Sequence, residues 1–228
     1  MTDDIRLIVE EDMEGAATRV AELLAEAAVA GQQIVLTGGR TPGRAHELAA
    51  QRQPDWSGAG VWWGDERCVP PEDERSNYGM AKQTLLDRLA GQPEVHRIHG
   101  EVEPEDAARG YDDELRGVRL DLLLLGIGPD GHTASLFPNE PTLGELERLV
   151  IPAEAKHEPF VERITLTLPA LTAAARVVFL VTGEEKAEAV GRAFGETPSR
   201  ETPASLVRAA SGDTTVVLDR AAAAKLPG

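Results

Sequence analysis

The chain has 228 residues, enough to bury a full hydrophobic core, and we expect one α/β domain over residues 1–228. Its 23 Lys and Arg residues against 39 Asp and Glu residues give a formal net charge of −16, which argues against a nucleic-acid partner or an anionic membrane. The N-terminus shows no signal peptide, no apolar run approaches membrane length, and the one cysteine, Cys68, fits a reducing compartment, so we expect a cytoplasmic protein.

Strands and helices alternate along the first half of the chain. In chain order we expect a strand over 5–9, a helix over 13–30, a strand over 34–37, a helix over 44–51, a strand over 61–64, a charged loop over 65–75, and a helix from the N-cap Ser76 through Leu89. The strands are short apolar runs, which is typical of strands buried on both faces of a parallel sheet.

The second half continues the same alternation. We expect a helix over 104–115, a strand over 122–125, a proline-broken region over 138–160, strands over 164–168 and 177–181, a helix over 184–194, a strand over 216–218 and a closing segment over 220–225. Residues 164–168 alternate apolar and polar side chains, which predicts an edge strand or a half-exposed face. The whole order predicts an α/β fold with a largely parallel sheet and helices on both faces.

The most informative stretch is residues 122–138, where four leucines lead into a Gly-Pro-Asp-Gly-His turn. The turn carries Asp130 and His132 beyond the carboxyl end of a buried strand, which is where open parallel sheets bind ligands. His132 is therefore a candidate catalytic residue, and either Asp130 or a backbone carbonyl would fix its tautomer. The structural alternative is a histidine that only caps a turn or forms hydrogen bonds within the core.

Two other readings of the sequence are excluded. Residues 126–131 spell a G-x-G-x-x-G dinucleotide fingerprint, which requires a long helix to open at its last glycine. Pro138 and Pro141 limit such a helix to about two turns, so we expect no nicotinamide cofactor. His96 and His99 lie three apart in an extended run, where their side chains do not converge, so we expect no metal site.

Three further strand ends carry residues suited to an anionic ligand. Gly38-Gly39-Arg40-Thr41 joins a strand to a helix, where backbone N–H groups and the Thr41 hydroxyl suit a phosphate, although an ordinary tight turn is the alternative. After the next strand, Arg67 can fork onto an oxyanion and Asp65 can orient it or bind a substrate hydroxyl, unless both are surface charges. Lys186 follows the strand over 177–181 and can neutralise a phosphate, the alternative being a solvated lysine.

Taken together, these segments resemble the 6-phosphogluconolactonase family over nearly the whole chain. The resemblance rests on Gly-Gly-Arg-Thr-Pro at 38–42, on Gly-Asp-Glu-Arg-Cys-Val-Pro at 64–70 with Ser-Asn-Tyr at 76–78, and on residues 126–138. The His-Thr-Ala-Ser-Leu-Phe-Pro run at 132–138 is the specific motif, and weaker matches follow in order at 163–166 and 183–187.

The resemblance implies a Rossmann-like fold shared with sugar-phosphate isomerases and glucosamine-6-phosphate deaminases. It implies a cytosolic enzyme of the oxidative pentose phosphate pathway whose partner is a small sugar-phosphate lactone, 6-phospho-glucono-1,5-lactone. We expect hydrolysis without a metal or cofactor, because a lactone is already an activated ester, and a monomer or small homo-oligomer.

The roles that follow from the residues and the implied substrate are specific. His132 would act first as general base and then as general acid, while the oxyanion would fall to loop N–H groups or to Arg67. The phosphate would lie at the Gly38 to Thr41 turn with Lys186, and with Arg40 or Arg163 as further ligands. Arg40 stands where the family usually has serine.

Two alternatives stay open, one a different enzyme on the same fold and one a protein that is not an enzyme. The first is an aminosugar-phosphate deaminase or isomerase, which in the pattern that we know places Phe-Asn-Glu-Pro soon after the histidine. Here Asn139-Glu140-Pro141 is displaced by three residues, which would move the carboxylate out of register. The second is a non-catalytic sugar-phosphate sensor, although the chain has no helix-turn-helix pattern and retains His132.

Overall fold

The computed structural model describes residues 5–156 and 158–226 of the chain. Its strands are β1 (Ile5–Glu10), β2 (Gln33–Leu36), β3 (Gly60–Trp63), β4 (Asp65–Arg67), β5 (Glu94–Val95), β6 (Leu122–Leu125), β7 (Val150–Ala153), β8 (Arg163–Leu166), β9 (Arg176–Val181) and β10 (Thr214–Asp219). Its α-helices are α1 (Met13–Val29), α2 (Arg40–Arg52), α3 (Asn77–Thr84), α4 (Pro104–Leu115), α5 (Leu168–Thr172) and α6 (Ala187–Gly195). Single 3-10 turns lie at Leu86–Arg88, Pro141–Gly144, Glu184–Lys186, Pro203–Leu206 and Ala222–Lys225.

The central sheet is parallel throughout, which confirms the predicted α/β fold. Its seven strands within the described residues run in the order β1-β10-β9-β6-β2-β3-β5. Strand β2 lies between β3 and β6, and its Ile34 pairs with Val61 of β3 on one side and with Leu122 of β6 on the other. Every residue of β6 is buried, as the run of four leucines predicts.

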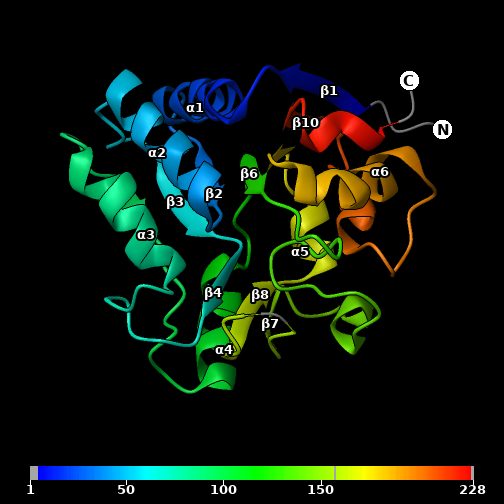
Figure 1. Cartoon of the computed structure of the whole chain (residues 1–228). Helices are drawn as coiled ribbons and strands as arrows, with labels where there is room; N and C mark the ends of the chain where they lie inside the picture. The colour runs from blue at the N-terminus through cyan, green and yellow to red at the C-terminus, as the bar shows by residue number, and fades with distance from the viewer. Residues whose placement is uncertain (1–4, 157, 227–228) are drawn as a thin grey trace.

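Helices cover both faces of this sheet (Figure 1). Helices α1, α2 and α3 lie on one side of the strands, and α5 and α6 lie on the other. No helix within the described residues is long and apolar enough to cross a bilayer. The extent of the domain over residues 1–228 stays a prediction.

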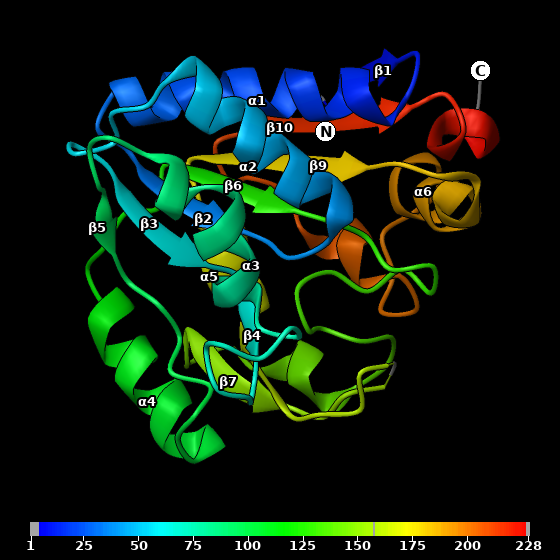
Figure 2. The same cartoon turned by 60° about the vertical axis from the view of Figure 1, so that its left-hand side comes forward.

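A second, antiparallel sheet corrects three of the expectations. Strands β4, β8 and β7 form it in that order, below the parallel sheet in Figure 2 and next to α4. Residues 65–67 therefore belong to a strand rather than to the charged loop predicted over 65–75, and β7 lies inside the region predicted to be proline-broken. The prediction of an edge strand or half-exposed face over 164–168 was wrong, because β8 is the central strand of this sheet.

The polar residues of β8 misled the prediction because hydrogen bonds allow them to be buried. Thr165 has no exposed surface, and its hydroxyl accepts a hydrogen bond from the Ser135 backbone N–H at 3.1 Å and donates one to the carbonyl of Leu166. A threonine whose hydroxyl is satisfied in this way can lie in a core as readily as a valine. Alternation along a strand therefore did not indicate exposure.

Two helix boundaries also differ from the prediction. Helix α2 begins at Arg40 rather than at residue 44, because Pro42 falls in the first turn, where its missing N–H group costs no hydrogen bond. Ser76 caps α3 as expected, with its hydroxyl accepting from the N–H of Gly79 at 3.0 Å, but α3 ends at Thr84 and a 3-10 turn replaces the rest of the helix predicted through Leu89.

Candidate active site

The loops after β2, β3, β6 and β9 enclose a cavity of about 270 Å³ at the carboxyl edge of the parallel sheet. Ligands bind at this edge in open α/β sheets. The predicted site residues that line the cavity are Gly38, Gly39, Asp65, Arg67, His132, Arg163 and Lys186. The fold thus brings together residues that lie as far as 148 positions apart, from 38 to 186.

His132 is held by Asp130 on the loop after β6. Its Nδ1 lies 2.6 Å from Oδ1 of Asp130, and its backbone N–H donates to the same oxygen at 3.1 Å. The imidazole ring also packs on Phe137, with ring centroids 4.9 Å apart. Of the two groups that the sequence left open, the carboxylate of Asp130 therefore contacts Nδ1, which places the proton of the neutral ring on Nδ1 and a lone pair on Nε2.

The glycines of this loop make the close contact between the two side chains feasible. A Cβ atom at Gly128 would lie 2.0 Å from Nδ1 of His132 and 2.6 Å from Oδ1 of Asp130. Gly131 has φ +98°, in the left-handed region that favours glycine. An isolated bridge between Thr133 and Leu136 follows, where a dinucleotide fingerprint would open a helix.

The predicted phosphate turn forms the N-terminus of α2. Gly39 precedes the helix with φ +115°, and Arg40 and Thr41 occupy its first turn. The Thr41 hydroxyl lies 2.7 Å from that of Thr182, which follows β9. Arg40 is exposed and, like Thr41, lines an adjoining cavity of about 260 Å³ that also reaches Lys186. The helix N-terminus, one lysine and one exposed arginine therefore surround a single region suited to an anion.

Two arginines face the cavity from the small sheet. Arg67 of β4 is the direct cross-strand partner of Arg163 of β8. Burial lowers the pKa of Arg163 from its usual value, and the neighbouring charge of Arg67 lowers it further. Like charges on directly opposed strand positions repel each other. An anion bound beside the pair would relieve that repulsion, even though the chain as a whole carries a charge of −16.

Asp65 and Arg67 lie two residues apart in β4, but their side chains have different partners. The Arg67 guanidinium donates to the backbone carbonyl of Arg75 at 2.6 Å. The Asp65 carboxylate accepts from Asn77 at 3.1 Å and from Ser135 at 2.7 Å. The expectation that Asp65 orients Arg67 thus has no hydrogen bond to support it, whereas Asn77 and Ser135 were not anticipated from the sequence.

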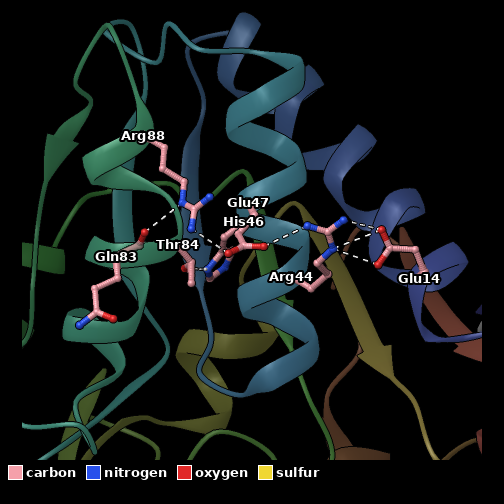
Figure 3. Close-up of polar contacts among 7 residues, drawn as sticks. All are labelled: Glu14, Arg44, His46, Glu47, Gln83, Thr84 and Arg88. Carbon is pink, nitrogen blue, oxygen red and sulfur yellow. Dashed lines mark hydrogen bonds and ion pairs between the residues drawn. The ribbon is translucent and has the colours of Figure 1, made fainter.

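A polar network fixes the helix that carries the phosphate turn (Figure 3). The Arg44 guanidinium of α2 forms two hydrogen bonds of 2.6 and 2.9 Å to the carboxylate of Glu14 in α1, and one of 3.0 Å to Glu47. Glu47 also accepts from Arg88, beyond α3, at 2.8 Å. Exposed ion pairs contribute little individually, but these bonds join α2 to α1 and to the 3-10 turn that follows α3.

No metal site and no activated thiol emerge from the described part of the chain. Within residues 5–156 and 158–226, no three His, Cys, Asp or Glu side chains are grouped as metal ligands would be. Burial raises the pKa of the Cys68 thiol to about 11, so it stays protonated at neutral pH.

Comparison with known proteins places the chain among sugar-phosphate enzymes. Residues 9–216 match the family model described as glucosamine-6-phosphate isomerases/6-phosphogluconolactonase. A 6-phosphogluconolactonase of Streptomyces coelicolor is 39% identical over 253 residues, covering 100% of this chain and 97% of the relative. A crystal structure of devB protein superposes with a TM-score of 0.89 at 34% identity, over 98% of this chain and 100% of that one. A 6-phosphogluconolactonase from Trypanosoma cruzi gives a TM-score of 0.88 at 27% identity, over 100% and 99% of the two chains.

The match extends over more than half of the chain, and the relatives are similar to it along nearly their full length. The fold, with its parallel sheet and its loops at the carboxyl edge, agrees with that of the solved structures. The chain belongs to the glucosamine-6-phosphate isomerase/6-phosphogluconolactonase family.

Proposed function

We propose that the protein hydrolyses 6-phospho-D-glucono-1,5-lactone to 6-phospho-D-gluconate in the oxidative pentose phosphate pathway. The observation that carries the proposal is the pair of His132 and Asp130, 2.6 Å apart, on a cavity that also presents Arg67, Arg163 and Lys186. The relatives named 6-phosphogluconolactonase support the same reaction. The proposal includes a cytoplasmic location.

Hydrolysis of the lactone needs an activated water, a stabilised oxyanion and a proton for the departing ring oxygen. Nε2 of His132 takes a proton from water as the water oxygen attacks the carbonyl carbon, and Asp130 stabilises the resulting imidazolium. The same proton passes to the ring oxygen when the bond between it and the carbonyl carbon breaks. The net change is addition of one water, and the reaction requires no metal and no cofactor.

The cationic residues divide between the two ends of the substrate. The backbone N–H groups at Gly38 and Gly39, with Lys186 and Arg163, bind the phosphate dianion, and Arg40 and Thr41 extend that site toward solvent. Arg67 stabilises the oxyanion that forms on the carbonyl oxygen. Binding of the phosphate thereby orients a reaction that occurs at the other end of the molecule.

The deaminase and isomerase alternative lacks its carboxylate at the site. Glu140, displaced by three residues in the sequence, has its carboxylate 3.3 Å from Nζ of Lys156 and does not line the cavity. The contact between His132 and Asp130 also argues against a sensor that only binds its ligand, because binding alone does not need an oriented acid–base group.

The test is an assay with freshly generated 6-phosphogluconolactone, in which acid release is followed against spontaneous hydrolysis. We expect a large acceleration that saturates with substrate. A folded sample that gives no acceleration would remove the lactonase proposal, and ammonia release from glucosamine 6-phosphate would then test the deaminase alternative.

Replacement of Lys186 by alanine is expected to raise KM by about 10- to 100-fold with little change in kcat, because a hydrogen bond to a charged group contributes about 1.5–3 kcal/mol. Lys186 lines both the cavity that holds His132 and the adjoining cavity at the phosphate turn, and in the proposal it binds the phosphate. Steady-state kinetics measures the two constants. Lys225→Ala is the control, since Lys225 contacts Glu188 at the surface. An unchanged KM for Lys186→Ala would place the phosphate elsewhere.

Replacement of Gly128 by alanine is expected to lower kcat by about 100-fold, since a displacement of the catalytic group by about 1 Å has an effect of that order. The new methyl group would overlap Nδ1 of His132 and force it away from Asp130. The matched control is Gly110→Ala, where no atom lies within 4 Å of the added Cβ. If Gly128→Ala keeps the kcat of the parent, the geometry of the pair does not matter for turnover.

A further inference from the structure

Ser135 is a buried serine on the loop that carries His132, and its hydroxyl is committed to Asp65. Its exposed fraction is 0%, and Oγ donates to Oδ2 of Asp65 at 2.7 Å. The one hydroxyl proton is used in this bond, so Ser135 affects the cavity through the carboxylate that it holds.

The second oxygen of Asp65 is held from another direction. Nδ2 of Asn77 donates to Oδ1 of Asp65 at 3.1 Å and to its backbone carbonyl at 2.9 Å. An ionised carboxylate has about four acceptor positions, and these two donors leave acceptor capacity on the side of Asp65 that lines the cavity. Only 5% of Asp65 is exposed, so a donor from a ligand would satisfy an acceptor that water reaches poorly.

Asn77 also fixes Asp65 relative to the phosphate turn. A Cβ atom at Gly38 would lie 1.9 Å from Oδ1 of Asn77, so the amide packs directly on the backbone of that turn. The Asp65 carboxylate is thereby held by Asn77 at the start of α3 and by Ser135 on the loop after β6, and Asn77 in turn packs on the turn after β2. This arrangement fixes the position of Asp65 between the phosphate turn and the His132 loop.

We propose that Ser135 is a positioning residue that holds Asp65 as the acceptor for one ring hydroxyl of the substrate, and that this contact makes the site selective for hydroxylated lactones. The inference rests on the proposed lactone hydrolysis. The ring of 6-phosphogluconolactone presents hydroxyls at C2, C3 and C4, each a donor that an ionised carboxylate can accept. A lactone without the recognised hydroxyl leaves a buried acceptor of Asp65 unpaired, which weakens its binding in the transition state.

The experiment compares kcat/KM for 6-phosphogluconolactone with that for its 2-deoxy, 3-deoxy and 4-deoxy analogues. For the unmodified protein we expect kcat/KM for the parent lactone to exceed kcat/KM for one of the analogues by a ratio of about 100 or more. A hydrogen bond to a buried charge supports discrimination of this size. In Ser135→Ala the carboxylate can turn away, and we expect that ratio to shrink to within about tenfold. Ser135→Thr, which keeps the hydroxyl, should restore most of the ratio.

The matched control is Thr133→Val. Thr133 is 1% exposed, and its hydroxyl donates to the Gly126 carbonyl at 2.9 Å, so the variant removes an equally buried hydroxyl from the same loop without touching Asp65. It should keep the ratio of the unmodified protein. Three results would overturn the inference: an unchanged ratio in Ser135→Ala, an equal loss of the ratio in Thr133→Val, or equal turnover of all three analogues by the unmodified protein. The last result comes from the unmodified protein alone, so it tests the inference even if a variant fails to fold. Absence of turnover even for the parent lactone would instead refute the proposed function.

Discussion

Replacement of His132 by alanine is expected to lower kcat for lactone hydrolysis by about two to four orders of magnitude, the usual contribution of a general acid–base group. In the proposed mechanism His132 supplies both proton transfers, to and from Nε2, and the carboxylate of Asp130 lies 2.6 Å from its Nδ1. The cationic residues that line the cavity, Arg67, Arg163 and Lys186, remain in place in this variant. KM should therefore change much less than kcat, and initial rates corrected for spontaneous hydrolysis measure both.

The control for this variant is His99→Ala. The His99 side chain is 58% exposed and does not line the cavity, so its loss should leave kcat unchanged. Circular dichroism spectra that coincide with that of the parent would show that both variants are folded. A kcat for His132→Ala within a few-fold of the parent value would remove His132 from the mechanism.

The second large effect concerns stability in acid and arises from His46. This side chain of α2 has no exposed surface; its Nδ1 lies 3.4 Å from the Thr84 hydroxyl, and its Nε2 has no hydrogen-bond partner among the described residues (Figure 3). Burial lowers the pKa of His46 from 6.5 to about 4. Below pH 6.5 the unfolded chain binds a proton at His46 that the folded protein does not bind, so stability falls as the pH falls.

Protonation of His46 in the unfolded chain should lower the free energy of unfolding by about 3 kcal/mol at pH 4 and by about 2 kcal/mol at pH 5. Each pKa unit of difference between the folded and unfolded states corresponds to about 1.4 kcal/mol. Urea unfolding at pH 7.5, 6 and 5 measures how the free energy of unfolding changes with pH. His46→Leu is the control because it fills the same space without titrating, and its stability should depend less on pH by this amount. Burial raises the pKa of Glu66, which has the opposite effect in acid, but Glu66 is present in both proteins. Parallel pH profiles for the two proteins would contradict the prediction.

Elements with a strong local signal were predictable from the sequence. The leucine run of β6 indicated a strand buried on both faces, and Ser76 indicated the start of α3 because a serine hydroxyl satisfies a helix N–H group. The glycine-rich turns after β2 and β6 marked the carboxyl edge of the sheet, and with it Gly38 and His132. Local chemistry decides each of these features.

Features that depend on partners distant in sequence were not predictable in the same way. Strand β4 has three residues of which all are charged, and only its pairing with β8, about 100 residues later, makes it a strand. The opposition of Arg67 and Arg163 follows from that pairing. Asn77 and Ser135 lie inside the family motifs at 76–78 and 132–138, but neither was predicted as a site residue, because an amide or hydroxyl takes on its role only through the group it meets, here Asp65.

The contact between Gly38 and Asn77 has a consequence for how such sequences can diverge. Because the amide oxygen of Asn77 occupies the volume that a side chain at residue 38 would need, neither position can change without regard to the other. A relative with alanine at the position of Gly38 needs a shorter side chain at that of Asn77, and would then have to hold the carboxylate of Asp65 by other means. The two positions, 39 residues apart, are therefore expected to change together among relatives.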